Sequence, residues 1–258
     1  MNPIETLFGL SKRTALVTGA SSGLGRHFAL TLARAGARVG IAARRADRLE
    51  DTAAAVRSLG QEVFSVCMDV TDIRSVQGAF QALDQSFGTP DIIVNCAGVA
   101  IFRSALEQTE ADWDTVVDTN LKGAWLVAQE AARRLIAVGQ AGTIINITSI
   151  TGERLAAGVA PYCASKAGLM HLTKAMALEW ASAGIRVNAL SPGYISTELN
   201  HDFLHSGAGE RLRGRIPQKR FGAVEDLDGP FLLLASNAGS YMTGCVLSVD
   251  GGHLVSTL

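Results

Sequence analysis

Charge is scarce in this chain, and nowhere is it concentrated. Charged residues make up 18% of the 258 residues, and the formal net charge is −1. No basic block and no acidic tail occurs along the sequence. Proteins that bind nucleic acid or anionic membranes usually carry such a basic patch. Neither nucleic acid nor a membrane is therefore expected as a partner.

Long apolar segments and paired cysteines are also missing. The longest apolar runs, such as 231–235, are far shorter than the about 18 residues of a membrane-spanning helix. Residues 1–5 show no basic segment followed by an apolar one, so a signal peptide is not expected. The cysteines are scattered, without a C-x-x-C pair: Cys67, Cys96, Cys163 and Cys245. Because isolated thiols are typical of a reducing compartment, we expect a cytoplasmic protein without disulfides or a metal site.

No repeat, low-complexity tract or Pro/Ser-rich linker divides the chain, so residues 1–258 are expected to form one domain. The expected strands are 14–18, 38–42, 62–68, 92–95, 143–148, 186–190 and 245–249. The expected helices are 25–35, 45–59, 73–87, 110–138, 161–183 and 225–235. The strand runs are almost continuously apolar, as in parallel sheets covered on both faces. The alternation predicts a single α/β domain, a doubly wound Rossmann-type fold with about seven parallel strands and helices on both faces.

The alternation is interrupted between Pro192 and Arg220, where glycines and scattered apolar residues stand among charges. A long irregular insertion in a compact α/β domain is usually a lid or a binding loop. We therefore expect a substrate lid at about 194–216, with loops 99–106 and 150–160 beside it. Apolar side chains in these loops predict a pocket with apolar walls: Ile101, Phe102, Leu155, Val159, Tyr194, Leu199, Phe203 and Leu204.

A glycine-rich turn follows the first predicted strand and leads into the first predicted helix. Its spacing is G-x-x-x-G-x-G, and the residues expected to contact a dinucleotide are Gly19, Ser21, Ser22, Gly23, Leu24 and Gly25. Glycines let the backbone approach a pyrophosphate, and a helix N-terminus supplies free N–H groups and positive potential. The alternative is a turn that only packs the helix on the strand. Its position between strand and helix favours dinucleotide binding.

The end of the second predicted strand bears on the choice of cofactor. Enzymes that use NAD place a carboxylate here for the ribose hydroxyls, whereas this chain has Ala43 followed by Arg44 and Arg45. A guanidinium group suits a 2′-phosphate because its planar fork makes paired, charge-assisted hydrogen bonds. The alternative is a solvated helix start, since Asp47 and Glu50 stand nearby. We expect NADP(H), with NAD(H) less favoured.

Two further strand ends fall on the same edge of the predicted sheet, where ligands of such folds bind. The residues expected to contact the cofactor there are Asp69, Val70, Asn95, Ala97 and Gly98. The carboxylate of Asp69 is able to accept a hydrogen bond from an adenine amino group. Helix capping by Asp69 or Asp72 is an equally open interpretation.

Four polar residues point to proton transfer at a carbonyl oxygen: Asn120, Ser149, Tyr162 and Lys166. Tyr162 and Lys166 are four positions apart in a predicted helix, so their side chains share one face. A free phenol has a pKa of about 10, which an adjacent ammonium and an oxidised nicotinamide are expected to lower. Tyr162 then acts as general acid or base, and Ser149 polarises the same substrate oxygen. Asn120 is expected to hold a water that links Lys166 to solvent.

With these motifs in this order, the chain resembles the short-chain dehydrogenase/reductase family over nearly its whole length. The matching segments are 18–25, Asp69, 95–98, Asn120, Ser149, 162–166, 192–193 and 249–252; Cys96 departs from the usual asparagine. The resemblance implies that Asn120, Ser149, Tyr162 and Lys166 form a catalytic tetrad. It implies that Tyr162 and Lys166 also contact the cofactor, Lys166 at the nicotinamide ribose. It adds a last cofactor-binding group, in which Thr197 contacts the carboxamide: Pro192, Gly193, Ile195 and Thr197.

The leading hypothesis is an NADP(H)-dependent carbonyl reductase or alcohol dehydrogenase acting on a small molecule. A 3-oxoacyl-thioester reductase is an alternative, suggested by cations that also suit a solvated segment: Arg211, Arg213, Arg215, Lys219 and Arg220. A sugar or polyol dehydrogenase is another. A non-catalytic NADP-sensing regulator is disfavoured, because Tyr162 and Lys166 are both present. A homotetramer is expected from the resemblance and from surplus apolar side chains on two predicted helices: Trp125, Leu126, Leu169, Met170 and Met176.

Overall fold

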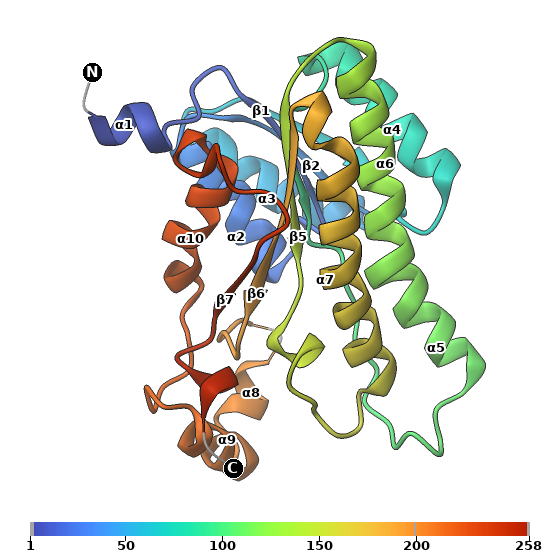
Figure 1. Ribbon diagram of the computed structural model, residues 1–258, viewed down its shortest axis with the longest axis vertical. Helices are drawn as coiled ribbons and strands as arrows, with labels where there is room; N and C mark the ends of the chain where they lie inside the picture. The colour runs from blue at the N-terminus through green and yellow to red at the C-terminus, as the bar shows by residue number, and fades with distance from the viewer. Residues whose placement is uncertain (1–2, 199, 257–258) are drawn as a thin grey trace.

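The computed structural model describes residues 3–198 and 200–256, and within them seven strands form one sheet (Figure 1). The strands are β1 (Thr14–Thr18), β2 (Arg38–Ala43), β3 (Val63–Cys67), β4 (Ile92–Asn95), β5 (Gly142–Ile147), β6 (Ile185–Pro192) and β7 (Val246–Val249). Their order is β3-β2-β1-β4-β5-β6-β7, and every neighbouring pair is parallel. Strands β2 and β3 are therefore added on one side of β1, and strands β4 to β7 are added on its other side.

The central strands are largely apolar because both of their faces are covered. All residues of β1, β4 and β5 are buried, whereas the edge strands β3 and β7 are partly exposed. All seven strands were predicted, each within two residues of its observed ends. The predicted doubly wound fold is confirmed.

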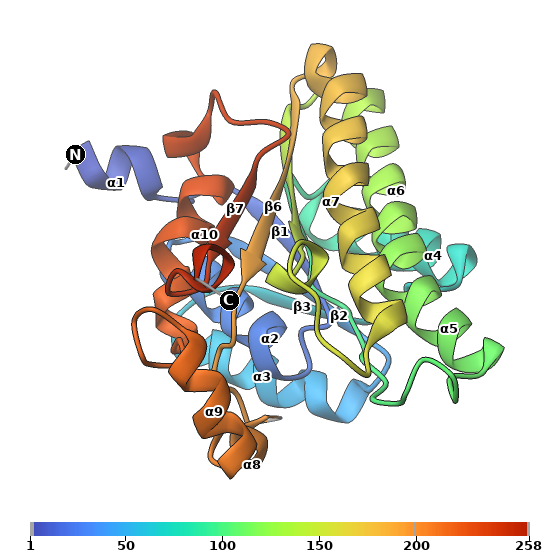
Figure 2. The same ribbon diagram turned by 60° about the horizontal axis from the view of Figure 1, so that its bottom comes forward.

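Helices cover both faces of the sheet (Figures 1 and 2). They are α1 (Pro3–Phe8), α2 (Gly23–Arg34), α3 (Ala46–Ser58), α4 (Ile73–Phe87), α5 (Glu110–Val117), α6 (Gly123–Ala137), α7 (Ala160–Trp180), α8 (His201–Leu204), α9 (Gly207–Arg215) and α10 (Asp228–Ala235). On one face α2 packs against α3 and α10, where the rings of Phe28 and Phe231 stack with centroids 4.3 Å apart. On the other face α4, α6 and α7 bury Phe80, Leu83 and Leu135.

Two predicted elements differ in detail from the structure. The predicted helix 110–138 is interrupted by a π-helical turn, Asp118–Lys122, in which Gly123 N–H donates to the Asp118 carbonyl. Such turns lie frequently at functional sites, and this one contains Asn120. The helix α1 was not predicted.

The expected lid is not the irregular loop that its glycines suggest. It contains α8 and α9, and Ser206 caps α9 by accepting a hydrogen bond from Gly209 N–H at 3.3 Å. A serine cap offsets the low helix propensity of this glycine-rich segment. Leu199, expected as a pocket wall, lies outside the described residues. None of the helices in the described part of the chain is long and apolar enough to cross a membrane.

Candidate active site

The glycine-rich turn lies between the carboxyl ends of β1 and β4, where the winding of the sheet reverses. Gly19 has φ +68°, and a Cβ there would stand 2.8 Å from the backbone of Ala97. A Cβ on Gly25 would stand 2.3 Å from the Gly19 carbonyl oxygen. Thr18 Oγ1 accepts hydrogen bonds from the N–H groups of Cys96 and Ala97, both at 3.1 Å. The two strand ends therefore form one tightly joined platform at the switch point, where dinucleotides bind in such sheets.

The helix that follows the turn presents free N–H groups. Ser22 is the N-cap of α2, and its side chain makes no capping hydrogen bond. The first N–H groups of a helix have no partner within the helix, and they favour an anion. With the missing Cβ atoms of Gly19 and Gly25, this geometry fits a pyrophosphate.

Two guanidinium groups stand where the second strand ends. Arg45 donates to Ser21 Oγ at 3.3 Å, which brings it beside the glycine-rich turn. The charge of Arg44 acts on Asp69. Neither arginine pairs with a carboxylate of the described residues, since Glu50 instead bonds Arg57 at 2.6 Å. These two cations are available for a 2′-phosphate, which favours phosphate recognition over the solvated helix start.

Asp69 belongs to a turn and does not cap a helix. Its Oδ1 accepts hydrogen bonds from Thr71 N–H at 3.0 Å and from the Thr71 hydroxyl at 2.8 Å. Burial raises the pKa of the Asp69 carboxyl, but the bonds from Thr71 and the charge of Arg44 together hold it below its usual value. Helix α4 is capped by Asp72, which accepts from Arg74 N–H at 2.9 Å. The side chain of Val70 is buried, so a cofactor contact there falls to its backbone.

At the end of β4, Asn95 and Gly98 have different surroundings. Asn95 donates to the Ala124 carbonyl at 3.0 Å and to Asn146 Oδ1 at 2.9 Å, so its side chain faces the layer beneath α6. Its Oδ1 has no hydrogen-bond partner among the described residues, but the side chain is buried and so is closed to direct contact with a cofactor. A Cβ on Gly98 would stand 3.3 Å from Asn120 Oδ1 and 3.6 Å from Lys166 Nζ. Gly98 therefore borders two of the four expected catalytic residues.

Asn120 is fully buried and holds two other segments in place. Its Oδ1 accepts from Val99 N–H at 2.8 Å. Its Nδ2 donates to the Val99 carbonyl at 2.9 Å and to Ser165 Oγ at 3.1 Å. Both amide hydrogens are therefore used, and a water is left only the second lone pair of Oδ1. Ser165, which we did not single out from the sequence, ties Asn120 to α7.

The hydroxyl groups of Ser149 and Tyr162 come together at the carboxyl edge of the sheet. Ser149 begins the 3-10 turn Ile150–Gly152, and its Oγ accepts from Thr151 N–H at 3.2 Å and from the Thr151 hydroxyl at 2.9 Å. Burial raises the pKa of Tyr162, while its hydrogen bond with Ser149 acts in the opposite direction. The net pKa is raised, so the phenol keeps its proton at neutral pH.

Lys166 lies one helical turn beyond Tyr162, with its Nζ 5.5 Å from the centre of the Tyr162 ring. The Nζ donates to the Ile147 carbonyl at 2.8 Å, and the residue is only 5% exposed. Burial lowers the pKa of Lys166 to about 8, although Cys96 acts against this shift. In this structure burial raises the pKa of Tyr162 more than its hydrogen bond lowers it. The prediction that Lys166 and an oxidised nicotinamide together lower this pKa concerns the protein with bound cofactor, and it stays a prediction.

The last expected cofactor segment follows β6. Gly193 N–H donates to the Val249 carbonyl at 2.9 Å, and a Cβ on Gly193 would stand 2.7 Å from Asp250 Cα. Pro192 closes β6 as a buried residue. The side chain of Ile195 is buried, and its carbonyl accepts from Asn200 at 2.9 Å. Thr197 donates from its hydroxyl to Asn200 Oδ1 at 3.2 Å, so a residue of the expected lid segment orients this threonine.

A cationic cluster lies beyond Tyr162, and we call it the mouth cluster: Arg154, Tyr194, Arg215 and His253. Arg154 donates to the His253 carbonyl at 2.5 Å and to Ser256 Oγ at 2.6 Å. The rings of Tyr194 and His253 have centroids 5.7 Å apart. Burial and the charges of Arg154 and Arg215 lower the pKa of His253, while the carboxylate of Asp250 acts in the opposite direction. Its Nδ1 is buried without a hydrogen-bond partner among the described residues.

Two positions in the sequence hint at this cluster: Arg154 follows Ser149 closely, and Tyr194 follows the Pro-Gly pair. The reach of the C-terminal segment to Arg154 has no local signal in the sequence. A cavity of about 180 Å³ opens beside Tyr194, next to Ile216 and Asp250.

Exposed apolar side chains occur in the loops expected to hold the substrate. They are Phe102 (77% exposed), Leu106 (99%), Leu155 (83%) and Phe203 (47%). Arg103 N–H donates to the Gly158 carbonyl at 2.9 Å, which joins the first two loops. Of the other expected wall residues, Val159 and Leu204 are buried, whereas Ile101 and Tyr194 are half-buried.

Comparison with known proteins agrees with this geometry. A family model described as enoyl-(acyl carrier protein) reductase matches residues 19–253. Gluconate 5-dehydrogenase of Gluconobacter oxydans is 38% identical over 251 residues, covering 97% of this chain and 98% of the relative. The 2-dehydro-3-deoxy-D-gluconate 5-dehydrogenase of Escherichia coli is 39% identical over 256 residues, covering 97% and 99%.

Among solved structures, a gluconate 5-dehydrogenase of Burkholderia cenocepacia in complex with NADP and tartrate superposes with a TM-score of 0.93. It is 36% identical, and the match covers 98% of this chain and 99% of that one. The chain belongs to the short-chain dehydrogenase/reductase family. It is an oxidoreductase that acts on carbonyl and alcohol groups with a nicotinamide dinucleotide.

Proposed function

We propose that this protein transfers a hydride between NADP(H) and a ketone or secondary alcohol, with Tyr162 as general acid and base. The adjacency of the Tyr162 and Ser149 hydroxyls, with Lys166 buried behind them, is the observation that carries the proposal. Two hydroxyl groups at one point are able to bind one substrate oxygen. A non-catalytic regulator that only senses NADP would need no such pair of hydroxyl groups.

In the direction of reduction, the Tyr162 hydroxyl donates its proton to the substrate oxygen. Ser149 donates a second hydrogen bond to that oxygen and stabilises the negative charge that develops on it. The raised pKa of Tyr162 suits this role, since a protonated phenol is required. In oxidation the same residues act in reverse, and the ammonium of Lys166 stabilises the phenolate.

The residues around the glycine-rich turn would hold the cofactor. The free N–H groups of α2 suit its pyrophosphate, Arg44 and Arg45 suit a 2′-phosphate, and Asp69 suits the adenine amino group. When bound, the nicotinamide supplies or accepts the hydride. NADP in the related Burkholderia structure supports this choice over NAD.

Two substrate classes have support. The exposed side chains of Phe102, Leu106 and Leu155 favour a ketone or alcohol with an apolar part. A second candidate, a sugar acid, is supported by the gluconate-acting relatives and by the cations Arg154 and Arg215 of the mouth cluster. A carboxylate is the group that such cations bind best.

A substrate panel decides between these classes. The consumption or formation of NADPH would be followed by absorbance with gluconate, sorbitol, an aromatic ketone and a 3-oxoacyl thioester. A rate with gluconate far above that with sorbitol would indicate that the mouth cluster binds a carboxylate. A rate with the ketone far above both would indicate that the exposed side chains of Phe102, Leu106 and Leu155 bind the substrate. A total lack of turnover with every class, in protein that binds NADPH, would contradict the proposed reaction.

We also propose a homotetramer located in the cytoplasm. The expected surplus of apolar surface is only partly found, because Leu126, Leu169, Met170 and Met176 are buried within the chain. The exposed residues that support association are Trp113 of α5, Trp125 of α6 and Leu178 of α7, at 47%, 38% and 84%. A cytoplasmic location is supported by the free thiols of Cys67, Cys96, Cys163 and Cys245.

A further inference from the structure

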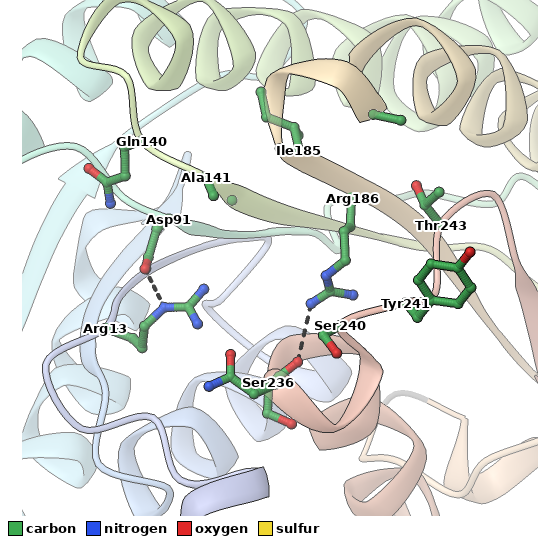
Figure 3. Close-up of a pocket in the computed structure, with 14 residues that line it drawn as sticks. Arg13, Asp91, Gln140, Ala141, Ile185, Arg186, Ser236, Ser240, Tyr241 and Thr243 are labelled. Atoms are coloured by element: carbon green, nitrogen blue, oxygen red, sulfur yellow. Dashed lines mark hydrogen bonds and ion pairs between the residues drawn. The ribbon is translucent and has the colours of Figure 1, made fainter.

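A large cavity lies at the amino edge of the sheet, opposite the candidate active site (Figure 3). It holds about 810 Å³ and is bordered by the starts of β5 and β6 and by the segment after α10. Its charged lining residues are Arg13, Asp91 and Arg186, so the cavity carries one more positive than negative charge. None of these residues takes part in the proposed hydride transfer.

The two arginines differ in how many of their N–H groups the protein uses. Arg13 forms an ion pair with Asp91 through Nε, and neither of its Nη atoms has a partner among the described residues. The other oxygen of Asp91 accepts from Thr14 N–H at 3.0 Å, so this carboxylate is already engaged twice. The four N–H donors on the Nη atoms of Arg13 therefore remain for a ligand or for water.

Arg186 has no carboxylate partner in the described part of the chain. Its Nη2 donates to the carbonyls of Leu234 at 3.0 Å and Ser236 at 3.2 Å, at the end of α10. Its Nη1 donates to the Met242 carbonyl at 3.3 Å. These acceptors are neutral, so they satisfy N–H groups without neutralising the charge. The guanidinium thus both fixes the end of α10 and faces the cavity.

The two positive charges also act on each other. Burial and the charge of Arg13 lower the pKa of Arg186. Figure 3 shows both guanidinium groups pointing toward the space between them. An anion in that space is attracted by both guanidinium groups against the single negative charge of Asp91, and it reduces the repulsion between the two arginines.

We propose that this cavity is a second ligand site, which binds a small oxyanion between Arg13 and Arg186. Guanidinium groups bind phosphate and carboxylate oxygens through paired, charge-assisted hydrogen bonds. Neutral polar groups of Gln140, Asn237 and Ser240 line the same cavity and suit the uncharged part of such a ligand. The volume accepts an organic phosphate or a tricarboxylate as well as inorganic phosphate.

Calorimetry on the full-length protein saturated with NADP⁺ tests the site, because the cofactor then blocks its own anion-binding turn. Inorganic phosphate, AMP and citrate would be titrated separately in a buffer without phosphate, and their ranking identifies the source of the oxyanion. Loss of one charge-assisted contact weakens binding by roughly 10- to 150-fold. We expect that loss in Arg13→Gln and a smaller loss in Arg13→Lys, which keeps the charge but not the planar fork.

Two further variants make the result independent of folding defects. Ser240→Asp leaves both arginines in place and supplies an internal carboxylate, so it should abolish binding. Arg57→Gln removes an exposed charge of α3 and should leave binding unchanged. Binding of none of the three anions at millimolar concentration would overturn the proposal. So would equal affinities in native, Arg13→Gln and Ser240→Asp proteins.

Discussion

At the scale of single residues, the adjacent hydroxyls of Tyr162 and Ser149 make the sharpest prediction. Tyr162→Phe removes the hydroxyl that delivers the proton in the proposed mechanism, and loss of a general acid costs about 10²–10⁴-fold in rate. We expect kcat to fall by that factor while NADPH affinity, measured by fluorescence titration, stays near native. Lys166→Ala should reduce both quantities. A Tyr162→Phe protein with near-native kcat would refute the mechanism.

The pKa directions at Tyr162 and Lys166 predict opposite pH dependences for the two reaction directions. Because the pKa of Tyr162 is raised, the phenolate needed for alcohol oxidation is scarce at neutral pH and becomes more abundant only at alkaline pH. Oxidation should therefore accelerate from neutral to alkaline pH, whereas ketone reduction should not. Lys166 loses its proton near its pKa of about 8, so the oxidation profile should bend there. Initial rates of oxidation and reduction as a function of pH provide the measurement. In Lys166→Arg the bend in the oxidation profile should move to higher pH. Parallel pH profiles for the two directions would contradict the prediction.

The choice of cofactor also depends on a few side chains. No carboxylate stands at Ala43, and Arg44 and Arg45 lie at the end of β2 beside the glycine-rich turn. A charge-assisted contact of about 1.5–3 kcal/mol corresponds to roughly 10- to 150-fold in binding. We expect kcat/KM with NADPH to exceed that with NADH by this order. Ala43→Asp with Arg44→Leu should reverse the preference, by adding repulsion and removing attraction.

Equal kcat/KM values with NADPH and NADH in the native protein would show that the two arginines are solvated residues at a helix start and do not bind a 2′-phosphate. Arg57→Gln is a matched control, since Arg57 pairs with Glu50 on the exposed side of α3. Its cofactor preference should be native.

At the scale of elements, α8 and α9 make the lid testable by hydrogen exchange. Their short length and glycines predict rapid amide exchange at 201–215 without ligand. Binding of cofactor and substrate should slow this exchange, since a closed lid excludes water from the reacting atoms. Helix α7 serves as an internal reference and should remain slow throughout. Slow exchange in the lid of the free protein, unchanged on binding, would contradict a mobile lid.

The elements also show what sequence reasoning reaches. Strands such as β4 and β5 were predictable because continuous burial leaves a continuous apolar run. The π-helical turn at Asp118–Lys122 was not, because its extra residue changes hydrogen bonding without changing apolar spacing. Helix α9 was hidden by its glycines, and only the cap of Ser206 signals it.

The candidate site was predictable to a similar extent. Motif order identified Ser149, Tyr162 and Lys166, and the structure brings them together. The effect of burial on the pKa of Tyr162 was not predicted, because burial depends on the packing of distant segments. For the same reason the approach of His253 to Arg154 could not be foreseen.

At the scale of the whole molecule, the exposed tryptophans Trp113 and Trp125 predict association into a homotetramer. Burying such side chains between symmetric copies is favourable because it removes apolar surface from water. Light scattering should give a mass about four times 27.1 kDa, with a dimer as the smaller alternative. Trp125→Glu should weaken the assembly, while Glu225→Gln on the other face should not. A stable monomer at micromolar concentration would refute the prediction.

The two ends of the chain lie at opposite edges of the sheet (Figure 1). Pro3–Phe8 is at the amino edge, whereas the segment before Ser256 is held by Arg154 near the mouth cluster. A purification tag fused to the C-terminus would therefore be tethered beside the mouth cluster. The same tag at the N-terminus would lie at the amino edge of the sheet, away from the mouth cluster, so it is the better choice for kinetic work.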